Sequence, residues 1–123
     1  MLHRIVDENE ELPPAFAASY HGQVSPLEFR ATAKNRTPQE RAKEATAALE
    51  GALDHNDGES FEVTVRIESD AAIVRVGEKV VASYYEVDAK IEGIPLPTFA
   101  AHVGTELSSF VPAQRTRRAI QLF

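Results

Sequence analysis

The sequence predicts an α+β fold, in which an antiparallel β-meander within residues 61–92 packs one face against helices at about 38–54 and 98–111. Three observations carry this prediction. Side chains alternate between apolar and polar within the meander segment, a capping motif precedes the first helix, and apolar residues recur with helical spacing in the second. No repeat or linker divides the chain, so residues 1–123 are expected to form a single α+β domain.

The first third of the chain is the hardest to assign. Residues 2–6 are a short apolar run, and residues 27–33 alternate strictly enough to favour a strand, so either could extend the meander. A capping-box match at 25–28 competes with that strand, and residues 15–20 are compatible with a short helix. The choice between strand, helix and loop therefore stays open for residues 12–35.

The helix at 38–54 has a clear beginning. Thr37 is a good N-cap, Pro38 suits the first helical position, and Glu40 completes a capping box. The expected buried stripe consists of small or aliphatic residues: Ala42, Ala45, Leu49, Ala52 and Leu53.

The register of the meander follows from its alternation. Phe61, Val63, Val65 and Ile67 share one face of the first strand. A two-residue turn at Ser69-Asp70 gives each inward residue an apolar partner, in the pairs Ile67 with Ala72, Val65 with Val74 and Val63 with Val76. A second turn at Gly77-Glu78 would then place Val81 opposite Val74 and Ser83 opposite Ala72.

The third strand is expected to run as far as Glu92, because apolar and charged residues keep alternating through Val87, Ala89 and Ile91. It would then outrun the second strand and leave its edge without a neighbour from about Tyr84 onward. Strand edges of this kind attract another strand. The candidates are residues 2–6, residues 27–33 and the same strand of a second copy.

The outer face of this meander is expected to carry an apolar patch beside that edge. Contiguous apolar groups at a surface are typical of binding sites. Folding of residues 12–26 over the patch is the alternative. The predicted interface comprises Ile73, Val80, Ala82, Tyr84, Val87 and Ala89.

The C-terminal third predicts two helices. The first, at about 98–111, presents Phe99, Val103, Leu107 and Phe110 on one face, and Pro112 is expected to end or kink it. A short helix over residues 113–122 would follow. Its basic residues could contact nucleic acid or could simply form a solvated helix end: Arg115, Arg117 and Arg118.

Composition excludes several function classes. The chain has no cysteine, so it has no disulfide framework and no thiolate-bound zinc. A net charge of −6 argues against binding to duplex nucleic acid. There is no apolar run of membrane-spanning length and no basic, apolar leader at the N-terminus, so a cytoplasmic protein is expected.

No catalytic, metal or cofactor site is predicted. The nucleotide-binding and hydrolase motifs are missing, and the spacing of residues 54–59 does not match a calcium loop. His102 and Glu106 stand four apart on the predicted helix, but a metal site needs a third ligand.

Three functions remain, in order of preference. The first is a non-enzymatic protein-interaction or assembly module that forms a homo-oligomer through the edge and outer face of its sheet. The second is a small-molecule binder or enzyme on the concave sheet face, with candidate polar groups Ser83, Tyr85 and His102. The third is a nucleic-acid-associated protein that uses the basic tail.

Overall fold

The computed structural model describes residues 12–54 and 61–121, with side chains described as far as Gln114. The described elements are, in chain order, β1 (Phe16–Tyr20), β2 (Gln23–Phe29), α2 (Pro38–Asp54), β3 (Val63–Glu68), β4 (Ala71–Val76), β5 (Lys79–Tyr85), α3 (Glu86–Glu92) and α4 (Leu96–Gln121). The mixed α+β class with antiparallel sheets and a C-terminal helix is confirmed. The expected strand at 2–6 lies outside the described residues.

The N-terminal region folds as a two-stranded hairpin. His21 (φ 46°) and Gly22 (φ 83°) connect β1 to β2, and two successive left-handed residues make the tight turn that suits twisted hairpins. Residues 15–20 are therefore not helical, and the second strand runs from Gln23 to Phe29 instead of 27–33. Its pairing with β1 is irregular around Pro26, which has no N–H to give to a ladder.

The first hairpin of the meander has the expected register. β3 pairs with β4 so that Val65 lies opposite Val74 and Ile67 opposite Ala72. Ser69 adopts φ 56° in the two-residue turn. The alternation of apolar side chains therefore selected the register correctly.

The second hairpin differs from the prediction by one residue. Val74 lies opposite Ala82, whereas the next residue, Arg75, lies opposite Val80, so Val81 is an extra residue in a β-bulge. After the bulge, every side chain of β5 changes face. Tyr84 consequently points to the side of the sheet that packs on α4, and Ser83 and Tyr85 point to the opposite side. The sequence predicts the reverse arrangement.

The third strand stops at Tyr85, and the segment expected to continue it is helix α3. The carboxylate of Asp88 accepts a hydrogen bond from the backbone N–H of Tyr85 at 2.8 Å, which satisfies one of the N–H groups left open at a helix start. Gly93 (φ 76°) ends the helix in a left-handed conformation. Two strong local signals thus outweigh the β-like alternation of residues 86–92.

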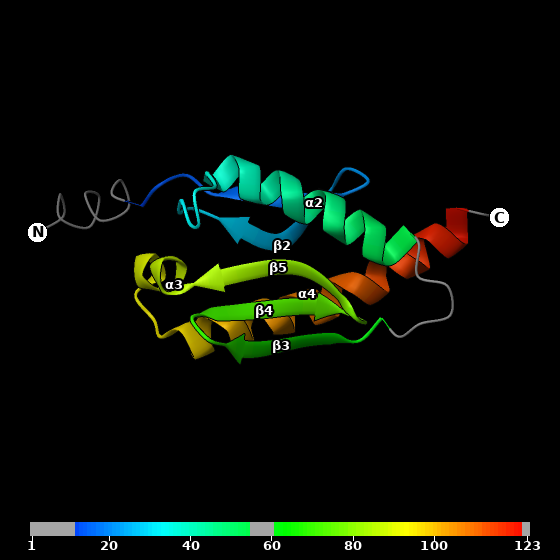
Figure 1. The fold of residues 1–123 in the computed structure, drawn as a ribbon. Helices are drawn as coiled ribbons and strands as arrows, with labels where there is room; N and C mark the ends of the chain where they lie inside the picture. The colour runs from blue at the N-terminus through cyan, green and yellow to red at the C-terminus, as the bar shows by residue number, and fades with distance from the viewer. Residues whose placement is uncertain (1–11, 55–60, 122–123) are drawn as a thin grey trace, which may run out of the picture.

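The helices cover different parts of the two sheets (Figure 1). α4 runs behind the three-stranded sheet and also packs on β2, whereas α2 lies in front along β1 and the edge strand β5. The prediction placed both helices on one face of the meander. We call the face of the three-stranded sheet toward α4 the inner face and the opposite one the front face.

The core joins all these layers. The predicted α2 stripe is buried from Ala42 to Leu53, and Val103 and Leu107 of α4 are buried as expected. Helix α4 is continuous past Pro112, so the two expected C-terminal helices are one. Pro112 and Ser108, the residue whose carbonyl the proline leaves without a partner, are both exposed, so water can satisfy that carbonyl.

Candidate functional site

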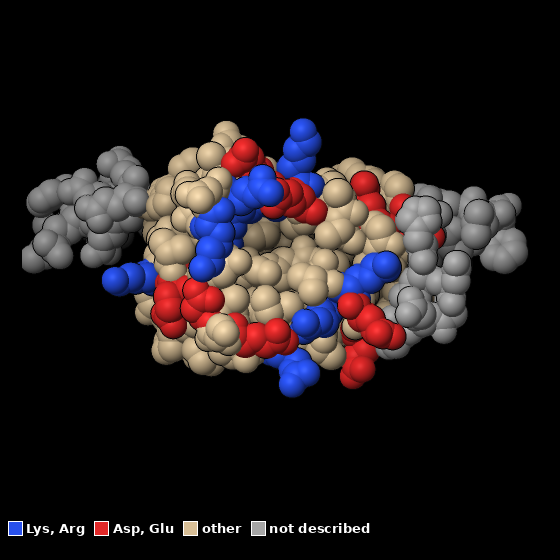
Figure 2. All heavy atoms as spheres, in the orientation of Figure 1, with Lys and Arg blue, Asp and Glu red and all other residues tan. Residues whose placement is uncertain are grey.

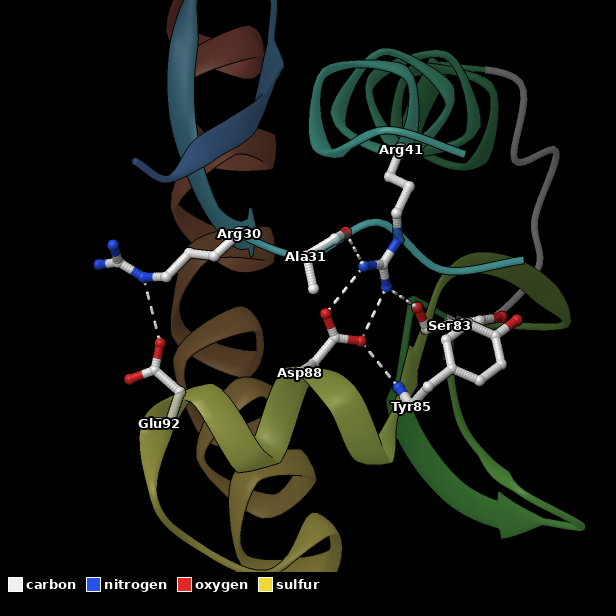
Figure 3. Close-up of polar contacts among 7 residues, drawn as sticks. All are labelled: Arg30, Ala31, Arg41, Ser83, Tyr85, Asp88 and Glu92. Atoms are coloured by element: carbon white, nitrogen blue, oxygen red, sulfur yellow. Dashed lines mark hydrogen bonds and ion pairs between the residues drawn. The ribbon is translucent and has the colours of Figure 1, made fainter. Parts of the chain in front are cut away.

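A buried ion pair stands where the two sheets meet. Arg41 of α2 and Asp88 of α3 are bound through two parallel hydrogen bonds, each of 2.8 Å, and both side chains are almost fully buried (Figure 3). Arg41 also donates to the carbonyl oxygens of Ala31 at 2.7 Å and Ser83 at 3.0 Å. One guanidinium group therefore connects α2, the segment after β2, strand β5 and helix α3.

Aromatic rings surround this guanidinium. Its central carbon lies 4.7 Å from the centre of the Phe29 ring and 5.7 Å from that of Tyr85. Phe29 in turn stacks on Tyr84 at 5.1 Å, which links β2 to β5 without a backbone ladder between them. Cation–π contacts gain strength when water is excluded, as it is here.

The pair separates two cavities. The first, which we call the front hollow, has a volume of about 330 Å³ and lies between α2, the 33–36 turn and the front of β5. Its inner surface comprises Phe29, Arg41, Ala45, Ala48, Val81 and Ser83. Figure 2 shows a depression in this region that is mostly formed by residues other than Lys, Arg, Asp and Glu, with residues of both charge signs around it. Arg41 in its inner surface is paired with Asp88.

Ion pairs form part of the border of the front hollow. Lys34 binds Asp70 at 3.0 Å, and Arg36 binds Glu44 at 3.1 Å. The hydrogen bond between Lys34 and Asp70 raises the pKa of the lysine ammonium and lowers that of the carboxyl group. All four side chains are well exposed, so these pairs contribute little to stability.

The second cavity, which we call the acidic cavity, has a volume of about 210 Å³ and lies between β2, α3 and α4. Its polar lining includes Glu28, Arg30, Asp88, Glu92, His102 and Glu106. Two of these residues, Arg30 and Glu92, form an ion pair at 3.2 Å (Figure 3). His102 and Glu106, the pair four residues apart in the sequence, thus do share one site.

Tyr84 also lines the acidic cavity, and its hydroxyl is the unusual group there. The residue is 0 % exposed, and the hydroxyl has no hydrogen-bond partner among the described residues. The pKa of this hydroxyl is raised above its ordinary value, mainly because the group is buried, and the nearby Asp88 carboxylate adds to the effect. The backbone N–H of Glu28 lies near enough to act weakly in the opposite direction on that pKa, but it makes no well-formed hydrogen bond to the hydroxyl.

The predicted interface residues are dispersed. Val80 remains exposed at the front hollow, and Ile73 is half-buried on the front face. Ala82 and Tyr84 belong to the buried core instead, because the bulge moves them to the inner face. The last two lie in α3, where Val87 is exposed and Ala89 is buried. The structure therefore does not bring these six residues together on one exposed surface.

The remaining candidate site residues lie in separate parts of the fold. Ser83 and Tyr85 line the front hollow, whereas His102 lines the acidic cavity, so the three polar groups do not converge. Arg115, Arg117 and Arg118 belong to the last turns of α4, beyond the described side chains, and their contact with nucleic acid stays a prediction.

Sequence reasoning missed Arg41 and Asp88, although both carry a signal. Arg41 precedes Ala45 and Leu49 on the same helical face, so a charge stands in an apolar stripe. Asp88 stands three residues after Tyr85, a spacing that suits a helix start. Neither signal by itself identifies the other residue as partner.

Residues 12–54 and 61–121 contain no group of three His, Cys, Asp or Glu side chains placed to hold a metal ion. In that same part of the chain, no helix is long and apolar enough to cross a membrane.

Comparison with known proteins assigns the family. A model of a domain of unknown function, DUF8459, matches residues 27–120. The chain belongs to the DUF8459 family. No curated protein and no solved structure matches it. The matched segment begins within β2 and extends into the last turn of α4, so both cavities lie almost entirely inside the DUF8459 domain.

Proposed function

We propose that this DUF8459 protein is a non-enzymatic interaction module that associates with a second copy of itself through the front of its three-stranded sheet. The observation that carries the proposal is the front hollow, a depression lined largely by apolar side chains and bordered by charges of both signs (Figure 2). Val80 stands at its border and is 47 % exposed. An apolar centre inside a polar rim is the usual anatomy of a protein interface.

The charge pattern favours a second copy as the partner. A two-fold interface brings one surface against itself, so it requires cations and anions on the same patch. The front of the molecule supplies them in the pairs Lys34 with Asp70, Arg36 with Glu44 and Arg75 with Glu68. Exposed pairs like these can exchange partners between copies at little cost in free energy.

Strand pairing would use β3 instead of the long third strand expected from the sequence. The backbone carbonyl of Ser83 on β5 already accepts from Arg41. On β3, the Gly77 N–H donates to the Glu62 carbonyl, so in this antiparallel ladder the even-numbered residues of β3 bond to β4. Val65 and Ile67 are odd-numbered, so their backbone N–H and C=O groups point away from β4, toward the open edge. Ile67 is also 49 % exposed, which suits an edge that another strand covers.

Light scattering and sedimentation across a dilution series test the proposal. We expect a dimer that dissociates on dilution and is weakened at least tenfold by Val80→Lys. The matched control is Val24→Lys, because Val24 is a 72 % exposed strand valine outside both cavities. A wild-type chain that stays monomeric at all concentrations would refute self-association.

A third variant separates the two surfaces. Ile67→Pro removes an N–H that the β3–β4 ladder does not use, so folding should persist, as circular dichroism will check. Dimer loss in Val80→Lys alone assigns the front hollow. Loss in Ile67→Pro alone assigns the β3 edge and contradicts the role of the hollow.

A small-molecule site in the front hollow is the second candidate function. Its volume of about 330 Å³ is within the usual range for ligand pockets, and the Ser83 and Tyr85 side chains that line it are polar. Fragment screening by NMR distinguishes the two functions. Fragments that shift the Ser83 and Tyr85 amides of a monomeric chain would favour ligand binding over self-association.

A further inference from the structure

The acidic cavity carries more negative charge than its own cations balance. Glu92 forms an ion pair with Arg30, and Asp88 forms one with Arg41. Glu28 and Glu106 also line the cavity, and neither has an ion pair within the described part of the chain. An anion would be repelled from this site, whereas a cation would be attracted.

Tyr84 supplies a second and independent indication of a ligand. Its hydroxyl is buried without a partner among the described residues, in a side chain that forms part of the cavity wall. A buried polar atom that makes no hydrogen bond destabilises the fold, so such atoms are rare unless something else satisfies them. A ligand that carries N–H donors would satisfy the tyrosine oxygen and the carboxylates together.

The rest of the lining selects the kind of cation. No set of three ligating side chains for a metal ion exists among residues 12–54 and 61–121. The other walls are apolar and aromatic, formed by Ile94, Phe99 and Val103. Such walls suit an alkyl chain, and the faces of aromatic rings attract an ammonium group.

We propose that the acidic cavity binds an alkylammonium group, with its nitrogen between Glu28, Glu106 and the Tyr84 hydroxyl and its alkyl chain against Phe99 and Val103. This site is separate from the front hollow and does not depend on self-association. Because the hydroxyl is fully covered in the structure, binding requires neighbouring side chains of the cavity to shift.

An alkylammonium group can belong to a free amine or to a lysine side chain of another protein. The probes are therefore 1,4-diaminobutane for the first and Nα-acetyl-lysine methylamide for the second, and 1,4-butanediol is the uncharged control. Binding is followed by NMR on the full chain at low salt. We expect both amines to shift the amides of Tyr84, Phe99 and Val103, and we expect the diol to shift none. The tighter amine identifies the source.

Two substitutions test the named contacts. Tyr84→Phe removes only the hydroxyl and should weaken amine binding about tenfold. Glu106→Gln should weaken it similarly, whereas Glu78→Gln, the matched control on the β4–β5 turn outside both cavities, should leave it unchanged.

Three results would overturn the proposal. The first is equal binding of the diol and the amines, and the second is an equal loss in Glu106→Gln and Glu78→Gln. The third is a set of amide shifts that maps outside the acidic cavity.

Discussion

The carboxylate of Asp88 holds the guanidinium of Arg41 in a two-point contact while it also accepts from the backbone N–H of Tyr85. One aspartate therefore begins helix α3 and anchors helix α2. Buried ion pairs are favourable only when such additional hydrogen bonds satisfy their remaining atoms. Here Ala31 and Ser83 accept from the same guanidinium, so the polar cluster is well satisfied.

Arg41→Met is expected to destabilise the protein strongly. It leaves the Asp88 charge buried without its partner, and removal of one member of a buried pair costs about 3–5 kcal/mol. Urea denaturation measures the loss. Lys43→Met on the exposed side of α2 is the control and should change the free energy of unfolding by less than about 0.5 kcal/mol. Equal effects of the two substitutions would contradict the role assigned to Arg41.

Tyr84→Phe is expected to stabilise the protein. The substitution keeps the ring contacts with Phe29 and Phe99 and removes a hydroxyl that has no partner in the described structure. A gain of about 1 kcal/mol in the free energy of unfolding should follow. The same variant should bind amines more weakly, so opposite changes in stability and binding would mark Tyr84 as a ligand-binding residue. A destabilised variant would mean that the hydroxyl is satisfied in solution.

The stability of the protein should fall at alkaline pH. The pKa of Tyr84 is raised in the folded state, mainly by burial, whereas an unfolded tyrosine ionises near pH ~10. Above that pH the unfolded chain loses this proton and the folded chain keeps it, so the contribution is fully present below pH ~10 and is lost as the pH rises. Urea midpoints between pH ~9 and ~11 measure the slope. Tyr84→Phe should reduce this slope. Tyr20 and Tyr85 are present in both the wild type and the variant, so the difference between the two slopes reports on Tyr84 alone, and equal slopes would contradict the assignment.

Two helical glycines should respond in opposite ways to alanine. A Cβ at Gly104 of α4 would come within 2.9 Å of Val65 Cγ2, whereas a Cβ at Gly51 of α2 would meet nothing within 4 Å. Gly51→Ala should therefore stabilise the protein by about 1 kcal/mol through helix propensity. Gly104→Ala should destabilise it by about 1 kcal/mol, because overpacking against a stiff valine outweighs the same gain.

Thermal or urea unfolding measures both glycine variants. Val65→Ala provides a further check, since the smaller side chain should relieve the clash and make Gly104→Ala neutral or stabilising in that background. Stabilisation by Gly104→Ala in the wild-type background would show that α4 can move away from β3 without cost.

The bulge in β5 explains why the sequence predicts the wrong face for the residues that follow it. Alternation identified β3 and β4 with the correct pairing, because the apolar side of each strand faces α4, buried in β4 and partly exposed in β3. The single extra residue at Val81 then exchanged the faces of all that followed, so Tyr84 was expected outside and Ser83 inside. A period of two cannot reveal a bulge when both faces carry apolar side chains.

The sequence by itself determined the elements whose signals are local. The capping box at Thr37 and Glu40 fixes the start of α2, and the spacing of Val103 and Leu107 identifies the buried face of α4. Side-chain alternation sets the β3–β4 register. Each of these features depends on residues that are neighbours in the chain or along one face, so no knowledge of distant contacts was needed.

Only the tertiary structure decided where the chemistry lies. Arg41 and Asp88 are 47 residues apart, and their pairing depends on α2 and α3 meeting beside β5. The acidic cavity likewise brings together residues of β2, β5, α3 and α4. The physical reason is that a buried charge or hydroxyl must find its partner in three dimensions, and the sequence alone does not indicate which distant segment supplies it.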